Sequence, residues 1–159
     1  MKTLIAYYSY SGHTDKVAKI FADQLKAKGE VELLRLKPKN EITSFAGQCR
    51  AALTRKRAEL DGAVKTDVSP YDLVIIGCPV WAFAPTPAMN TYLDKVNGLH
   101  GKKVVVLLTS GSGVGVNRCF KNIRVILESK GASHIDEINV PDRKLDDEAF
   151  IISSLEKYL

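Results

Sequence analysis

Cysteine is scarce in this chain, and its spacing excludes two kinds of site. Only three cysteines, Cys49, Cys78 and Cys119, occur among 159 residues. No two of them have the spacing of a zinc-ligand pair or of a CxxC redox motif. An odd number of widely separated cysteines offers no disulfide framework and suits a reducing compartment. We therefore expect a cytoplasmic protein without a metal site.

Long hydrophobic runs are also missing. The longest apolar stretch, Leu73 to Pro85, contains two prolines and is shorter than the roughly 20 residues that cross a bilayer. The apolar residues near the N-terminus lead directly into hydroxyl residues, without the organisation of a signal peptide. The sequence therefore predicts no membrane insertion.

Acidic residues are outnumbered, with 18 Asp and Glu against 23 Lys and Arg, which gives a net charge of +5. A basic excess can attract an anionic partner. However, zinc-finger spacing, an RNP aromatic motif and a long basic run are all absent. We interpret the excess as a solvated, lysine-rich surface and expect no nucleic-acid binding.

Apolar runs and helical periods alternate along the chain. Nearly continuous or partly alternating apolar residues predict strands, the last of them at an edge, over 2–9, 30–36, 72–78, 103–110 and 133–140. Apolar residues at helical spacing predict helices over 13–29, 86–98, 117–131 and 145–159. The segment 37–70 is less regular, and we expect a helix in its middle, within 43–62.

This order of elements predicts an α/β fold. Alternating strands and helices favour a doubly wound parallel sheet of about five strands, with helices on both faces. The length fits one domain with its own core, and no linker or repeat interrupts it. We therefore expect residues 1–159 to form a single domain.

The first predicted strand ends in an unusual loop, SYSGHT, at residues 9–14. In an open parallel sheet, ligands bind beyond the carboxyl ends of the strands. A helix N-terminus exposes unpaired N–H groups that attract an anion, and Gly12 allows close backbone approach. A single hydroxyl there is usually only a helix cap. Three hydroxyls with a glycine, and no Lys or Arg, favour a site for one phosphate group.

Two further strand ends carry loops that suit a flat ring. Trp81 and Phe83 lie between Pro79 and Pro85, which argue against a continuing strand, so we interpret the aromatic residues as a stacking platform. The loop TSGSGVG, at 109–115, offers hydroxyls and backbone amides for the polar edge of a heterocycle, although many turns look similar. Together the three loops describe a site for a mononucleotide with a large ring.

These loops resemble those of the flavodoxin-like family of FMN-binding proteins. The similar motifs are YYSYSGHT, GCPVWAFAPTPAMNTYL and TSGSGVG, and the resemblance covers essentially the whole chain. It implies FMN as cofactor and the strand order 2-1-3-4-5. It implies that the FMN phosphate is surrounded by Ser9, Tyr10, Ser11, Gly12, His13 and Thr14. It implies that one side of the ring is bordered by Pro79, Val80, Trp81, Ala82 and Phe83. It implies that the other edge is lined by Thr109, Ser110, Gly111, Ser112 and Gly113.

Two functions stay open at this point. The first is an electron carrier that docks on redox partner proteins, which the lack of a visible nicotinamide pocket favours. The second is an FMN-dependent NAD(P)H oxidoreductase that passes electrons to a quinone or a similar small-molecule acceptor. Because the flavin performs the chemistry in either case, we expect no catalytic acid or base.

Two other proteins of similar architecture are excluded. A phospho-receiver domain needs an acidic cluster after the first strand and an Asp at the end of the third, where this chain has YYSYS and Cys78. A low-molecular-weight phosphatase needs five residues between its cysteine and arginine. Cys119 and Arg124 are separated by four residues and lie within a predicted helix.

The chain differs from the family in charge, which leads to a prediction. Flavodoxins that carry electrons are typically acidic, whereas residues 77–92 and 109–120 contain no Asp or Glu, and basic residues gather at 50–57. Acidic residues near the flavin disfavour its anionic, two-electron-reduced form, since like charges a few ångströms apart repel by about 1 kcal/mol even in water. We therefore expect the second electron to enter the bound flavin at a less negative potential than in an acid-walled flavodoxin. A potentiometric titration that gave an equally low value would refute this.

Overall fold

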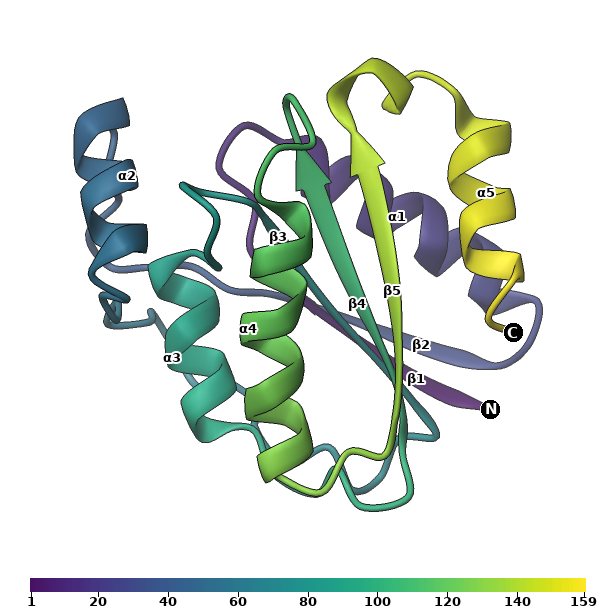
Figure 1. The fold of residues 1–159 in the computed structure, drawn as a ribbon. Helices are drawn as coiled ribbons and strands as arrows, with labels where there is room; N and C mark the ends of the chain where they lie inside the picture. Colours follow the sequence, from purple (N-terminus) through teal and green to yellow (C-terminus); the bar gives the residue numbers. More distant parts are fainter.

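Five parallel strands form one sheet in the order β2-β1-β3-β4-β5, in a computed structural model that describes all 159 residues (Figure 1). The strands are β1 (Lys2–Tyr7), β2 (Glu30–Arg35), β3 (Leu73–Pro79), β4 (Lys103–Ser110) and β5 (His134–Pro141). The predicted fold class, the strand order and the edge position of the last strand are all confirmed.

Helices cover both faces of this sheet (Figure 1). They are α1 (His13–Lys26), α2 (Phe45–Leu53), α3 (Pro87–Lys95), α4 (Val116–Ser129) and α5 (Glu148–Glu156), with a short 3-10 turn, η1 (Asp142–Lys144), before the last. Figure 1 shows α1 and α5 on one side, α3 and α4 on the other, and α2 at the periphery. None of these helices combines the length and apolar character needed to span a bilayer.

The two faces of the sheet build two separate hydrophobic cores, because successive side chains of a strand point to opposite sides. In β1, Ile5 belongs to the core under α1 and α5, whereas Leu4 and Ala6 belong to the core under α3 and α4. The central strands are therefore buried on both faces, which is why their sequences are almost continuously apolar.

The irregular segment before β3 contains the helix that the sequence predicted within 43–62. Helix α2 begins after Ser44, whose hydroxyl accepts a hydrogen bond from the Gly47 amide at 3.2 Å. It ends at Leu53, because Arg55 adopts a left-handed conformation with φ of 51°. The basic residues that follow the helix therefore lie in an irregular connection to β3.

Burial predicts how unevenly aromatic residues contribute to stability. Phe21 of α1 is fully buried, whereas Phe45 at the start of α2 is 80% exposed. We expect Phe21→Ala to lower the free energy of unfolding by about 3–5 kcal/mol, because it leaves a cavity under α1. Phe45→Ala is the matched control, with an expected change within about 0.5 kcal/mol. Urea denaturation of the two variants measures the difference, and similar values would contradict the assigned core.

Candidate functional site

The loop after β1 and the end of β4 meet at the carboxyl edge of the sheet. The buried hydroxyls of Thr14 and Thr109 lie 2.8 Å apart and form a hydrogen bond. Gly77 of β3 makes this approach possible, since a Cβ there would lie 3.4 Å from Cγ2 of Thr14 and 3.3 Å from Cβ of Tyr7. The start of α1 therefore rests directly on the ends of the central strands.

The first loop offers unused hydrogen-bond donors. Helix α1 begins after Gly12, which has φ of 92° and provides no side-chain cap. The amides of His13, Thr14 and Asp15 have no acceptor in the chain. The first amide of the helix that has one is that of Lys16, which donates to Gly12 O at 3.0 Å. Nearby, the hydroxyl of Ser9 is buried and has no hydrogen-bond partner. Free amides and an unpartnered hydroxyl at a helix N-terminus are typical of an anion site.

The other residues of this loop face solvent or neighbouring segments. Tyr10 and Ser11 are exposed, and Gly12 faces open space, since an added Cβ would meet no atom within 4 Å. His13 is only partly buried, and its Nδ1 lies 3.0 Å from Oδ1 of Asp142, just after β5. The imidazole is therefore engaged by a carboxylate on a distant segment.

A cation that the sequence analysis missed lies next to the first loop. Arg35, at the end of β2, donates from Nη2 to Ser9 O at 3.3 Å and from Nη1 to Asp15 at 3.4 Å. Burial alone would raise the pKa of Asp15, but hydrogen bonds from Lys19 and Tyr7 hold it below its ordinary value. Burial, together with the bond to Asp15, raises the pKa of Tyr7. The register that pairs Tyr7 with Arg35 places this charge there, and no motif in the loop itself indicates it.

The second loop is a tight hairpin that presents aromatic rings. Trp81 and Ala84 exchange backbone hydrogen bonds of 3.1 and 3.0 Å. Between them, Ala82 and Phe83 both have positive φ, of 44° and 69°, a conformation that costs free energy for residues other than glycine. The turn leaves Trp81 half-buried and Phe83 40% exposed. Phe83 is therefore outside the core, as the sequence interpretation expects, whereas Trp81 also packs against the core under α3 and α4.

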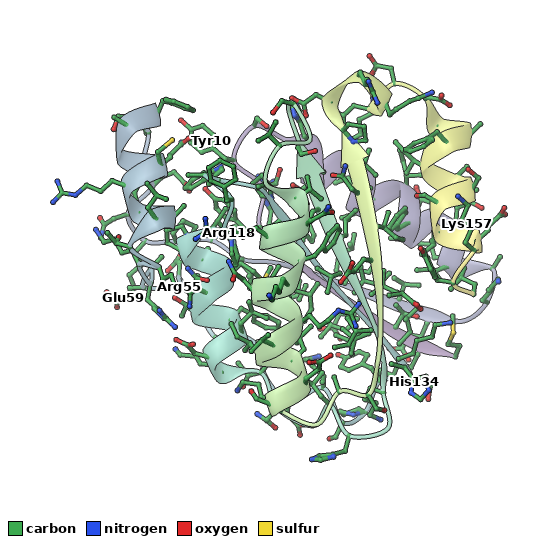
Figure 2. The ribbon with its side chains drawn as sticks, viewed as in Figure 1. Tyr10, Arg55, Glu59, Arg118, His134 and Lys157 are labelled. Carbon is green, nitrogen blue, oxygen red and sulfur yellow. The ribbon has the colours of Figure 1, made fainter.

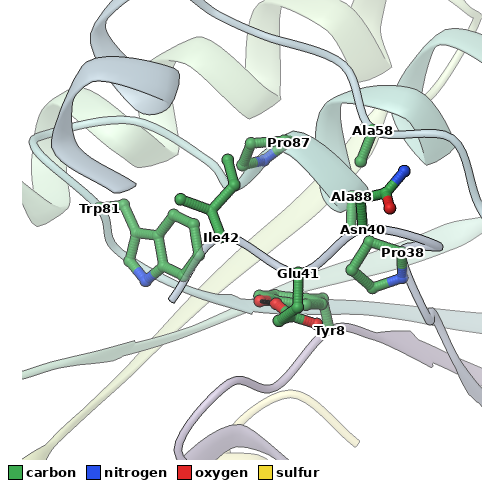
Figure 3. Close-up of a pocket in the computed structure, with 9 residues that line it drawn as sticks. All are labelled: Tyr8, Pro38, Asn40, Glu41, Ile42, Ala58, Trp81, Pro87 and Ala88. Carbon is green, nitrogen blue, oxygen red and sulfur yellow. Dashed lines mark hydrogen bonds between the residues drawn. The ribbon is translucent and has the colours of Figure 1, made fainter. Parts of the chain in front are cut away.

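Trp81 lies beside the first loop rather than in the interior. Its ring meets those of Tyr8 and Tyr10 edge-on, at centroid distances of 5.8 and 6.0 Å. A pocket of about 20 Å³ lies between Trp81, Tyr8 and the segment before α2. Figure 3 shows the residues that line it. This volume holds about one water molecule, so the pocket is not a ring-binding slot.

Strand β3 extends one residue further than the sequence predicted. Pro79 pairs with Thr109, and the amide of Val80 donates to Thr109 O at 2.9 Å. The proline is tolerated because β1 ends at Tyr7, which pairs with Gly77, so no strand lies beside it on that side. Pro79 and Val80 are both half-buried at the rim of the sheet.

The third loop is anchored at its base and exposed at its tip. Ser110 is buried and donates from its hydroxyl to Oδ1 of Asn139 at 2.9 Å. Gly111, Ser112 and Gly113 are exposed, and the Ser112 hydroxyl accepts a hydrogen bond from the Val114 amide at 3.3 Å. The buried hydroxyls of Thr109 and Ser110 are therefore engaged in hydrogen bonds within the chain, and the backbone amides of the tip and the O–H of Ser112 remain as donors.

The second and third loops contact each other through Gly115, which the sequence analysis did not single out. A Cβ on Gly115 would lie 2.2 Å from Cδ1 of Phe83 and 3.0 Å from its Cα. Gly115 also has φ of 84° and begins α4 without a side-chain cap. A third glycine in the GSGVG pattern was the signal that could have identified it.

Two carboxylates reach the site from distant segments, although the loops themselves contain none. Asp142 Oδ2 lies 3.7 Å from the position of a Cβ on Gly111. Glu41, ahead of α2, accepts a hydrogen bond from the Tyr8 hydroxyl, and burial with this bond raises the pKa of Tyr8. The expectation of an acid-free surrounding therefore holds for the loop sequences but not for their neighbours in space.

Free amides at a helix N-terminus, an aromatic hairpin and a glycine-rich tip lie at one edge of a 2-1-3-4-5 sheet, an arrangement typical of the doubly wound α/β class, which binds ligands at this edge. The chain belongs to the flavodoxin family, whose model, described as Flavodoxin, matches residues 2–139. The expected flavodoxin-like FMN-binding family is thereby confirmed.

Individual relatives agree with this assignment. The chain is 29% identical over 105 residues to NAD(P)H dehydrogenase (quinone) 3 of Rhizobium meliloti (strain 1021), covering 66% of this chain and 48% of that protein. It therefore spans about half the length of this relative. It is similar to a flavoprotein in complex with FMN from Lactobacillus acidophilus NCFM, with 25% identity, a TM-score of 0.68 and coverage of 93% and 98% of the two chains. Oxidised flavodoxin 1 from Bacillus cereus shares the fold, with 16% identity, a TM-score of 0.62 and coverage of 100% and 99%.

The contact between Gly115 and Phe83 leads to a stability prediction. Gly115→Ala and Gly113→Ala both place a side chain at positive φ, 84° and 78°, which costs about 1–2 kcal/mol. Only Gly115→Ala also pushes against the backbone of Phe83, which adds about 1–3 kcal/mol. We therefore expect Gly115→Ala to be the more destabilising in urea denaturation. Equal losses in the two variants would show that the hairpin is free to move away.

Proposed function

We propose that this chain binds FMN across the three loops and carries electrons between redox partners. The observation that carries the proposal is the buried, unpartnered hydroxyl of Ser9 beside the free amides that follow Gly12. Trp81 supports it, since it stands next to this anion site through its edge contact with Tyr10. A phosphate site and an aromatic wall are thus adjacent, as the two ends of FMN require.

The residues of the first loop fit a phosphate monoester. The amides of Ser11 to Thr14 and the hydroxyl of Ser9 would donate to its oxygens, and Arg35 adds a positive charge nearby. The hydroxyl of Thr14 already bonds Thr109, so its amide is the available donor. The side chain of His13 is held by Asp142, and we assign the phosphate only its backbone.

The second and third loops fit a flat, polar-edged ring. Trp81 and Phe83 would cover one side, framed by Pro79, Val80 and Ala82. The amides of Gly111, Ser112 and Gly113 would bond the polar edge, while Thr109 and Ser110 hold the loop in place. When bound, FMN supplies the ability to accept and release one or two electrons. The chain supplies binding, orientation and shielding from water.

A second candidate is an FMN-dependent oxidoreductase that takes electrons from NAD(P)H and passes them to a quinone or similar acceptor. The relative named NAD(P)H dehydrogenase (quinone) 3 favours it, although this chain spans only about half of that protein. The chain would need no acid or base residue of its own, because bound FMN would supply the hydride-accepting chemistry. Steady-state oxidation of NADH or NADPH by the FMN-loaded protein, with a quinone present, separates this candidate from the carrier.

Ser9 provides the test of FMN binding. We expect Ser9→Ala to weaken FMN binding about tenfold, since it removes one hydrogen bond to a charged group. The free energy of unfolding without FMN should change little, because the hydroxyl has no partner in the chain. Quenching of FMN fluorescence measures the affinity.

The matched control is Thr3→Val. The hydroxyl of Thr3 is also buried without a partner, but it lies at the start of β1, far along the strand from the first loop. We expect this variant to bind FMN as tightly as the parent protein. If the parent protein takes up no FMN, the proposed function is wrong; if both variants bind equally well, only the role of Ser9 is wrong.

A further inference from the structure

A basic pocket lies next to the second loop, on the side of the sheet covered by α3 and α4. Its volume is about 290 Å³. Arg55 and Arg57 enter it from the connection after α2, Pro85 from the end of the second loop, and Lys121 from α4. Asn90 of α3 and Asn122 of α4 add amide groups, and no carboxylate lines the pocket.

One of the three cations is held in place and neutralised. Arg57 donates to both carboxylate oxygens of Asp94, from Nε at 2.8 Å and from Nη2 at 2.9 Å. Its Nη1 also donates to Arg55 O at 2.7 Å. The Arg57 guanidinium therefore acts mainly as a clamp that fixes the connection against α3.

The other two cations have no acidic partner. Arg55 reaches across to α4, where its Nη2 lies 3.5 Å from Oδ1 of Asn122, and Lys121 makes no ion pair. Figure 2 shows Arg55 on the side of the molecule where α3 and α4 lie. The pocket thus carries about two uncompensated positive charges, a substantial part of the net charge of +5.

The backbone holds Arg55 in this position at a cost. Its φ of 51° lies in the left-handed region, which is uncommon for residues other than glycine, asparagine and aspartate. The Arg55 amide donates to Ala52 O at 3.0 Å, and its carbonyl accepts from Arg57, so both sides of the residue are fixed. Strained residues persist where the surroundings over-determine them, which is common at binding sites.

We propose that this pocket binds the phosphate groups of a second, phosphorylated small molecule, a hydride donor that would be oxidised by two electrons while the bound flavin accepts the hydride. The proposal rests on the proposed function for the exchange of electrons, but the anion site stands on the pocket itself. Arginine and lysine with amide donors and no carboxylate are the groups that recognise phosphate. The volume suits a diphosphate group, whereas a complete dinucleotide would extend beyond it.

The position of the pocket suits such a molecule. Pro85 lines the pocket and follows Phe83 by two residues, so the wall of the pocket continues into the aromatic hairpin of the flavin site. The pocket is concave, which favours a small anion over the flat acidic surface of a protein. A ligand anchored here by phosphate would extend along the second loop toward the ring.

The experiment titrates FMN-loaded protein with inorganic pyrophosphate, NADPH and NADH, and follows binding by calorimetry. Loading with FMN keeps the phosphate site of the first loop occupied. We expect pyrophosphate to bind the parent protein, and Arg55→Asn and Lys121→Gln each to weaken it roughly tenfold, since each removes one charged donor. Asparagine is chosen at position 55 because it tolerates positive φ.

The control is Lys157→Gln, which removes the same charge from the residue after α5, on the opposite side of the molecule (Figure 2). We expect it to leave pyrophosphate binding unchanged. Arg55→Lys, which keeps the charge, should retain most of the affinity, and circular dichroism verifies that each variant is folded. The double variant combines Arg55→Asn with Lys121→Gln. Pyrophosphate that fails to bind the parent protein, or that binds the double variant as tightly as the parent, overturns the proposal and favours an acidic protein as the partner of the basic surface.

The nucleotide titrations identify the source of the phosphate. If the double variant binds both NADPH and NADH more weakly than the parent, the pocket holds the pyrophosphate of a dinucleotide. If only NADPH binds more weakly, the pocket holds its 2′-phosphate. If only pyrophosphate binds more weakly and the affinities for both nucleotides are unchanged, the pocket serves another phosphorylated molecule. FMN uptake is measured separately by absorbance. Failure of uptake therefore refutes the proposed function, whereas normal uptake without pyrophosphate binding refutes only the pocket.

Discussion

The hydrogen bond between Thr14 and Thr109 joins the start of α1 to the end of β4, and the site depends on it. It can form because β1, β3 and β4 are parallel and adjacent, so that their carboxyl ends reach one edge together. Gly77 of β3 has no side chain and leaves room for the contact between the two threonines. Without this close approach, the free amides after Gly12 and the ring of Trp81 would not share one rim.

Backbone conformation gives this rim its chemistry. Gly12 and Gly115 begin their helices in the left-handed region without a side-chain cap, which leaves amide groups available to a ligand. Ala82 and Phe83 adopt the same region at a cost, and their turn keeps an aromatic ring at the surface. Gly115 receives Phe83 because it has no side chain, so the second and third loops support each other.

Charge around the site comes mostly from segments that are distant in the sequence. Arg35 reaches the first loop from β2, Asp142 approaches the third loop from the residue after β5, and Glu41 bonds Tyr8 from the segment before α2. On the other side of the aromatic hairpin, Arg55 contributes to a pocket with a positive field. Acidic groups therefore lie near some parts of the candidate site and basic groups near others. A reduction potential inferred from the loop sequences alone leaves these groups out.

The alternation of apolar runs and helical periods determined the fold, because a strand buried on both faces needs a continuous hydrophobic sequence whatever surrounds it. The three loops could also be found in the sequence, since SYSGHT, PVWAFAP and TSGSGVG each combine residue types that their local conformation requires. Strand register, helix packing and the path of the segment before β3 decided the rest. They placed Arg35 and Asp142 beside the first and third loops and Arg55 in the neighbouring pocket, engaged the hydroxyls of Thr14 and Ser110 in hydrogen bonds within the chain, and paired Gly115 with Phe83. Such contacts join residues far apart in the chain, and no local pattern encodes which distant group will arrive.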